Sequence, residues 1–178
     1  MLHTLEINIR PAVLSDAIDM AEVYMGSFEA AYKNIIPADY IREKRVNSNE
    51  NMIRVLSDEN YSRFQYVILH KDAIVGVMTV APARDDDTDD SFYELHGIYI
   101  SPNYFRQGIG AQAINFALDK ARTLGKQTMI LWVFADNICS IKFYEKSGFI
   151  TDGKTRTLNC GKPLIAIRMR REINSQII

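Results

Sequence analysis

One strand–turn–helix stretch constrains the fold more than any other part of the chain. Glu94 to Ser101 is rich in β-forming residues, and a helix is predicted from about Gly110 to Leu124. Gly108 and Gly110 lie where the strand turns into the helix, and glycine lets a backbone approach a ligand closely. Unpaired N–H groups and the positive end of the helix dipole suit a bound pyrophosphate. The neighbouring Arg106 offers a charged contact to a phosphate.

A glycine turn of this kind also occurs as a plain connection between a strand and a helix. The spacing does not fit the G-x-x-x-x-G-K-[ST] pattern of nucleotide triphosphatases. The third glycine of a dinucleotide-binding fingerprint is missing as well. The turn therefore disfavours these two enzyme classes, and by itself it leaves phosphate binding and a purely structural role open.

The rest of the chain contains no internal repeat and no linker rich in Pro, Gly or Ser, so we expect a single domain spanning residues 1–178. Strands and helices alternate along it, which predicts an α/β domain with a mixed sheet. The further predicted strands are 6–10, 66–69, 73–80, 129–134, 149–155 and 164–170, and the further predicted helices are 18–32, 37–56 and 138–147.

Composition excludes several classes of protein. The 178 residues are 47% hydrophobic and carry a net charge of −1, which favours a packed core and gives no field that attracts nucleic acid or an anionic membrane. No apolar run approaches the roughly 20 residues needed to span a bilayer, and the first ten residues lack the apolar region of a signal peptide. Cys139 and Cys160 have no metal-binding spacing and are expected to be free thiols in a reducing cytoplasm.

Two motifs about thirty residues apart carry a resemblance to a known family. Asn137 to Phe149 resembles the N-x-x-[SA]-x-x-[FL]-Y-x-x-x-G-F stretch of the GNAT superfamily of N-acetyltransferases at every fixed position. Phe105 to Gly110 is similar to that family's acetyl-CoA loop, [QR]-x-x-G-x-[GA], and 31–37 looks like a segment common in bacterial members. The resemblance implies a mixed, mostly antiparallel central sheet of six to seven strands, flanked by about four helices. It also implies direct acetyl transfer from acetyl-CoA to a primary amine in a ternary complex, without a metal.

The resemblance assigns the cofactor contacts residue by residue. Phe105 departs from the family pattern, which has Gln or Arg there, so that side-chain contact is in doubt, and Arg106 or Gln107 is the alternative for it. The backbone N–H groups of 107–111 need no particular side chain and are expected to hold the pyrophosphate. The full set that the resemblance assigns to acetyl-CoA is Ile98, Tyr99, Ile100, Phe105, Arg106, Gln107, Gly108, Ile109, Gly110, Ala111, Asn137, Ser140 and Tyr144.

Three residues are candidates for catalysis. Tyr144 matches the tyrosine that many family members place near the thioester sulfur, where a phenol can donate a proton to the leaving thiolate. The alternative is a core tyrosine. Glu94 and His96 lie two apart on one strand, share a face, and are candidates for the base that deprotonates the amine. The alternatives are that Glu94 is a solvent-facing strand residue and that His96 is a half-buried structural histidine. Backbone N–H groups near Ile98 are expected to stabilise the oxyanion of the reaction.

The acceptor is not identified by the sequence, and small amines and protein N-termini both stay open. Tyr32 is the candidate for facing the acceptor, because the first two helices line that side in the family. The acidic stretch Asp85–Asp90 is expected to be a solvated loop, with a cationic acceptor or a metal as less favoured interpretations. Family members often form homodimers. A non-catalytic module that binds or senses acyl-CoA is the alternative function.

Overall fold

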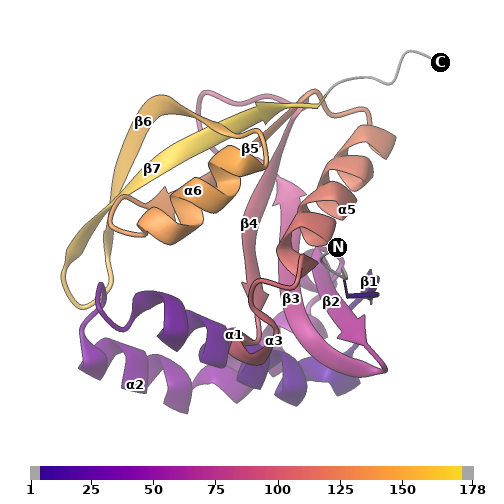
Figure 1. Ribbon diagram of the computed structural model, residues 1–178, viewed down its shortest axis with the longest axis vertical. Helices are drawn as coiled ribbons and strands as arrows, with labels where there is room; N and C mark the ends of the chain where they lie inside the picture. Colours follow the sequence, from indigo (N-terminus) through magenta and orange to yellow (C-terminus); the bar gives the residue numbers. More distant parts are fainter. Residues whose placement is uncertain (1–4, 174–178) are drawn as a thin grey trace.

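The computed structural model describes residues 5–173, which form one seven-stranded sheet (Figure 1). The strand order is β1-β2-β3-β4-β5-β7-β6, and every neighbouring pair is antiparallel except β4 and β5. This confirms the expected mixed, mostly antiparallel sheet. The strands are β1 Asn8–Pro11, β2 Gln65–His70, β3 Ala73–Pro82, β4 Phe92–Ile100, β5 Thr128–Phe134, β6 Ile150–Asn159 and β7 Pro163–Glu172.

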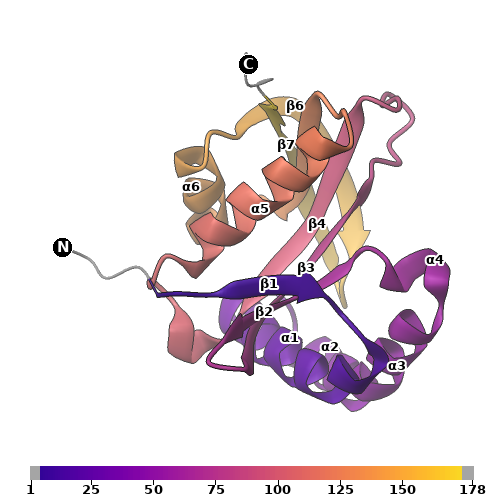
Figure 2. The same ribbon diagram turned by 90° about the vertical axis from the view of Figure 1, so that its right-hand side faces the viewer.

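Within the described part of the chain, six α-helices cover the two faces of the sheet. Helices α5 and α6 lie on one face, and α1 to α4 lie on the other (Figure 2). No helix in residues 5–173 has the length and apolar character needed to cross a membrane. The helices are α1 Ala17–Tyr32, α2 Ala38–Val46, α3 Ser48–Ser57, α4 Glu59–Ser62, α5 Ile109–Thr123 and α6 Ile138–Lys146.

The expected single helix over 37–56 is wrong, and so is the expected number of about four helices. The chain breaks at Asn47 into α2 and α3, and α4 adds a further turn. The Asn47 side chain donates to the carbonyl of Glu43, and the Ser48 hydroxyl donates to that of Arg45. Such local side-chain bonds offer the backbone an alternative to continuing a helix. The break lets α3 turn Leu56 into the core beside Ala17 and Met20 of α1.

The main core lies between α5 and the sheet. Ala113, Ala117 and Ala121 are fully buried, so one face of α5 is made of small side chains that bring the helix close to the strands. Met129 to Leu131 of β5 are at most 1% exposed, as predicted for a strand at the centre of a sheet covered on both faces. This tight packing fixes the positions of β4, β5 and α5, whose ends carry the polar groups described below.

Candidate active site

Strands β4 and β5 pair only at their beginnings. Their parallel register covers Phe92 to Glu94 of β4, although β4 continues to Ile100. Beyond Glu94 the two strands diverge, and β4 keeps its other neighbour β3 as far as Ile100. The far half of β4 therefore presents one backbone edge that no strand of the sheet covers.

The alternation of the strand decides which residues face that edge. The Ser101 N–H donates to the carbonyl of Val75 next to β3, over 2.8 Å. Since successive residues of a strand point their backbone groups to opposite sides, Ile100 and Ile98 point theirs to the open edge. Tyr99 points its own towards β3, although the resemblance groups it with the cofactor-binding residues. Its side chain lies on the face of the sheet that α1 covers, where its ring packs against Tyr24.

The turn after β4 presents a row of free backbone donors. The N–H groups of 107–111 have no acceptor within the described part of the chain, because a helix start leaves its first donors unpaired. Gly108 precedes α5 at a φ of 80°, a left-handed conformation that favours glycine. The side chains of Phe105 and Arg106 are exposed beside the turn, whereas the Gln107 side chain donates back to the carbonyl of Asn103.

Helix α6 brings a second set of polar groups to the divergence of β4 and β5. Its N-cap is Asn137, which is 5% exposed and whose Oδ1 accepts from the N–H of Ser140. The Nδ2 of Asn137 is buried and has no hydrogen-bond acceptor in good geometry within residues 5–173, although the side chain lies near the hydroxyl of Tyr32, whose pKa burial raises and the Asn137 contact partly lowers. A buried donor of this kind points to a missing acceptor. A Cβ on Gly110 would lie 2.9 Å from the ring of Phe143, so α6 rests directly against the start of α5.

Tyr144 lies on α6, close to the centre of this arrangement. Its ring packs against Phe143 and Phe149 with centroid distances of 5.3 and 5.9 Å. Burial, together with the nearby Tyr32, raises the pKa of the Tyr144 hydroxyl above its ordinary value. The phenol therefore stays protonated at neutral pH, and its hydroxyl makes no hydrogen bond within residues 5–173.

A β-bulge on β4 aims the candidate bases at one pocket. Gly97 pairs with Thr79 and Leu95 with Val80, so His96 is the extra residue of the bulge. The bulge reverses the alternation, which puts Glu94, His96 and Tyr99 on one face. They meet there in a pocket of about 200 Å³ lined by Phe28, Tyr32, Tyr40, Lys44, Glu94, His96, Tyr99, Trp132, Phe134, Arg156, Leu158, Cys160 and Ala166. We call this the acceptor-side pocket.

Glu94 and His96 form a close pair inside the acceptor-side pocket. Glu94 is 5% exposed, and its Oε2 lies 3.7 Å from Nε2 of His96. Burial raises the pKa of Glu94, and the charge of Asp85 adds to the effect. Burial lowers the pKa of His96, and the charges of Arg84 and Arg156 lower it further. At neutral pH the imidazole is therefore uncharged, and the pair can accept a proton.

Most aspartates of the acidic stretch Asp85–Asp90 are exposed, as expected, but two of them are tied to the sheet. Arg168 of β7 is 5% exposed and binds Asp85, Asp87 and Asp152 at 2.9, 2.7 and 2.7 Å. Asp85 also accepts from Nε1 of Trp132, a residue of the acceptor-side pocket. The loop is thus clamped to the sheet, because a buried guanidinium needs carboxylate partners. The described residues hold no cluster of three or more His, Cys, Asp or Glu side chains arranged for a metal.

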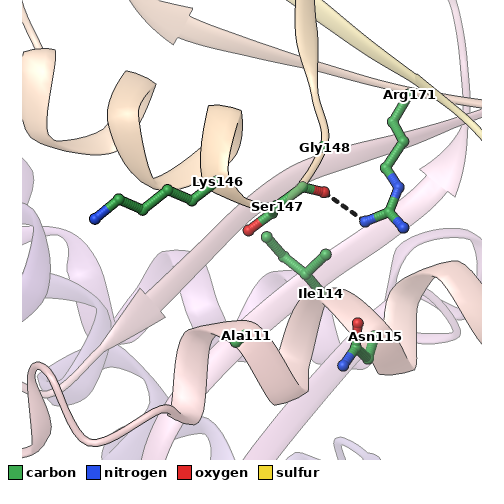
Figure 3. A pocket seen from close by; sticks show the side chains of 7 residues that line it. All are labelled: Ala111, Ile114, Asn115, Lys146, Ser147, Gly148 and Arg171. Atoms are coloured by element: carbon green, nitrogen blue, oxygen red, sulfur yellow. Dashed lines mark hydrogen bonds between the residues drawn. The ribbon is translucent and has the colours of Figure 1, made fainter.

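A second crevice of about 370 Å³ lies between α5 and the end of α6 (Figure 3). Arg171 of β7 donates to the carbonyl of Ser147 there, and Lys146 points away from Arg171. Asn115 lines the opposite wall, one turn beyond Ala111. The crevice therefore opens beside the same end of α5 that carries the free N–H donors.

The structure brings most of the sequence-predicted residues together and adds others. Tyr32 does line the acceptor-side pocket, with its ring 5.5 Å from that of Phe134. Sequence reasoning missed Lys44, Trp132 and Arg156 as lining residues, since no motif marks them.

Comparison with known proteins agrees with this geometry. Residues 20–149 match the acetyltransferase (GNAT) family. A protein named uncharacterized N-acetyltransferase YuaI, of Bacillus subtilis, is 27% identical over 139 residues, 78% of each chain. The [ribosomal protein bS18]-alanine N-acetyltransferase of Escherichia coli K12 is 30% identical over 64% of this chain and 74% of its own. The N-acetyltransferase MJ1207 of Methanocaldococcus jannaschii is 38% identical over 56 residues, only 25% of that protein.

Solved structures share the fold over nearly the whole chain. PaiA N-acetyltransferase from Thermoplasma acidophilum, in complex with coenzyme A, superimposes with a TM-score of 0.73 at 20% identity, covering 94% of this chain and 99% of its own. YncA from Salmonella typhimurium, with acetyl-CoA, gives 0.69 at 18% identity, covering 97% and 96%.

Proposed function

Because the chain belongs to the acetyltransferase (GNAT) family, we propose that it transfers the acetyl group of acetyl-CoA to a primary amine by direct attack in a ternary complex. The acceptor is a small molecule or the amine of a protein or peptide; the E. coli relative is named for an alanine of a ribosomal protein. The observation that carries the proposal is that a free backbone edge, a row of free N–H donors and the close pair of Glu94 and His96 lie around the divergence of β4 and β5.

The cofactor end of the proposal rests on backbone geometry. The open edge at Ile98 and Ile100 suits the amide groups of the pantetheine arm, which would add to β4 much as a further strand does. The orphaned Nδ2 of Asn137 supplies a donor for a carbonyl of the same arm. The N–H groups of 107–111 receive the pyrophosphate, because a helix start favours negative charge.

The nucleotide end of acetyl-CoA extends towards the crevice between α5 and α6. That crevice begins at Ala111, next to the proposed pyrophosphate donors, and carries the basic side chains of Lys146 and Arg171. Positive charge there suits the phosphate on the ribose of coenzyme A.

The acceptor must lose a proton before it attacks. A lysine-like amine has a pKa of about 10.4, so making the free base at pH 7 costs roughly 4–5 kcal/mol. Glu94 and His96, directly or through one water, take that proton and pass it to solvent. Because the two side chains lie 3.7 Å apart, both can accept the proton of the same amine.

The transfer then proceeds at the thioester carbonyl. The nitrogen lone pair forms the new C–N bond, and backbone N–H groups near Ile98 stabilise the negative oxygen of the tetrahedral intermediate. The C–S bond breaks with its electron pair going to sulfur, and Tyr144 donates a proton to the thiolate. The nitrogen loses its second proton, and the tyrosinate recovers one from solvent. The products are the N-acetylated amine, coenzyme A as the thiol, and one released proton.

The test is the release of coenzyme A thiol from acetyl-CoA by the purified protein against pools of amines. We expect release with at least one pool, and a loss of tenfold or more in kcat in the Tyr144→Phe variant. Undiminished release by that variant would remove Tyr144 from the mechanism. Binding of acetyl-CoA without release from any pool would favour a non-catalytic acyl-CoA sensor instead.

A further inference from the structure

The acceptor-side pocket contains two cations that no carboxylate of the described chain neutralises. Lys44 of α2 and Arg156 of β6 both line it, and neither has an ion pair within residues 5–173. Two other basic side chains nearby are paired, since Arg45 binds Glu29 and Arg168 binds three aspartates. Arg84 also acts on His96 by its charge, but it does not line the pocket. Two unpaired cations in one small pocket favour an anionic group on whatever enters it.

Aromatic rings hold these two cations in place. Nζ of Lys44 lies 5.3 Å from the ring centre of Tyr24 and 5.2 Å from that of Phe28. The guanidinium of Arg156 lies 4.2 Å from the ring centre of Trp132. Contacts of this kind orient a cation without neutralising its charge, so its N–H donors stay available.

Arg156 is also close to the proposed base pair. Its charge is near enough to lower the pKa values of both Glu94 and His96. An amine that delivers its proton to that pair would therefore place an adjacent carboxylate within reach of the guanidinium. The remaining walls combine apolar side chains, such as Phe28, Phe134 and Leu158, with the rings and hydroxyls of three tyrosines. These surroundings match an amine, a carboxylate and an apolar side chain on one small molecule.

We propose that the acceptor is a small amino acid-like molecule whose carboxylate is bound by Arg156, with help from Lys44, while its apolar side chain fills the acceptor-side pocket. This inference rests on the proposed acetyl transfer and names its class of acceptor. The bonds formed and broken are those given above, and the carboxylate takes no part in them.

The same charges disfavour a polycationic acceptor such as a polyamine. In the acidic loop, which could attract one, Asp85 and Asp87 already bind Arg168. Inside the pocket, Lys44 and Arg156 outnumber the single carboxylate of Glu94, since His96 is uncharged at neutral pH. A second ammonium group would meet repulsion there.

The first experiment compares acceptors that differ in one group. L-phenylalanine, L-phenylalaninamide, 2-phenylethylamine, spermidine and a short peptide are each titrated with acetyl-CoA, and kcat/KM is measured for each. We expect L-phenylalanine to exceed the amide and the amine at least tenfold. The amine of the amide loses its proton more easily, so the amide would be the better acceptor if the carboxylate were not bound. Equal or better use of the amide, of spermidine or of the peptide would overturn the inference.

The second experiment changes the cations. Arg156→Gln and Lys44→Met are expected to lower the ratio of kcat/KM for L-phenylalanine over 2-phenylethylamine, by tenfold or more for Arg156→Gln and about threefold for Lys44→Met. Arg42→Met is the matched control on α2, since Arg42 is exposed and pairs with Asp39 outside the pocket. A ratio that stays constant in Arg156→Gln would refute the assigned contact.

A binding measurement separates this inference from the proposed acetyl transfer. Calorimetric titration of the protein saturated with coenzyme A needs no turnover. L-phenylalanine is expected to bind, and the Arg156→Gln variant to bind it at least tenfold more weakly. If coenzyme A release failed with every acceptor while this binding persisted, the transferase proposal would fail and carboxylate recognition would stand. If release occurred without any preference for a carboxylate, acetyl transfer would stand and carboxylate recognition would fail.

Discussion

The proposed cofactor side and the proposed acceptor side of the site use different kinds of polar groups. On the cofactor side most polar groups are backbone edges and helix-start N–H groups, from β4 and α5, with Asn137 as the side-chain donor next to the pantetheine arm. On the acceptor side they are side chains from α2, β4 and β6, and aromatic rings orient the two cations among them. A backbone site tolerates changes in sequence, whereas a side-chain site can differ from one relative to the next.

The loop clamp, by which Arg168 binds Asp85, Asp87 and Asp152, should give the largest loss of stability when it is removed. Arg168→Met is expected to lower the free energy of unfolding by about 3 kcal/mol, because it leaves Asp85, Asp87 and Asp152 without their buried partner. The melting temperature should fall by roughly 6–12 °C in calorimetry. Arg170→Met is the control on the same strand, since its exposed pair with Glu172 is worth about 0–1 kcal/mol. Equal losses in the two variants would show that no clamp exists.

Acid should weaken the same clamp. The guanidinium of Arg168 holds the pKa of Asp87 well below its ordinary value of 3.8 in the folded chain. A depressed folded pKa adds stability above the unfolded value and loses it as the pH falls through the folded value. The stability difference between the wild type and Arg168→Met should therefore shrink below about pH 4. A difference independent of pH would contradict the ion-pair origin.

The base pair provides the next largest effect. Glu94→Gln with His96→Ala is expected to lower kcat about a hundredfold, and each single change roughly tenfold, because either partner can accept the proton alone. The wild-type kcat should rise with increasing pH and reach its plateau before pH 6.5, since burial lowers the pKa of His96 from 6.5. In His96→Ala the rise should follow Glu94, whose pKa is raised above 4.5. Full activity in the double variant would exclude both residues.

On the proposed cofactor side, Asn137→Asp tests the side-chain donor that we assign to the pantetheine arm. The Asp side chain keeps the acceptor that caps α6 at Ser140 but loses the buried Nδ2 donor. The dissociation constant of acetyl-CoA should rise about tenfold in calorimetry, with little change in melting temperature. Asn137→Ala, which loses both functions, should also lower the melting temperature. Wild-type affinity in Asn137→Asp would mean that Nδ2 makes no contact with the cofactor.

The smallest effect should come from strain in the backbone site itself. Gly108→Ala forces a side chain into a left-handed conformation at roughly 1–2 kcal/mol, and the shifted N–H groups should weaken acetyl-CoA binding about fivefold. Gly125→Ala is a matched control, because its φ of 71° carries the same strain at the far end of α5, with open space around it. If both variants lose similar stability but only Gly108→Ala binds acetyl-CoA more weakly, the turn at Gly108 belongs to the cofactor site. Equal affinities would remove the turn from the cofactor site.

The sequence predicted the cofactor side better than the acceptor side. The strand, the glycine turn and the helix around Gly108 are contiguous, so local propensity and spacing located them. The division of the helix at Asn47 was missed, because a local side-chain bond overrode the apolar pattern. The clamp of Asp85 and Asp87 was missed too, since its partner Arg168 lies about eighty residues further along the chain.

The sequence by itself determined the family, the α/β class and the order of the strands along the chain, because short-range patterns of apolar residues, glycines and motif spacing encode them. Only the tertiary structure decided which residues meet. A single bulge at His96 reverses the alternation of β4 and puts Tyr99 beside Glu94. The sheet order brings β6 opposite α2, so Arg156 and Lys44 share a pocket although they lie more than a hundred residues apart. Such meetings depend on the packing of distant elements, which no local pattern records.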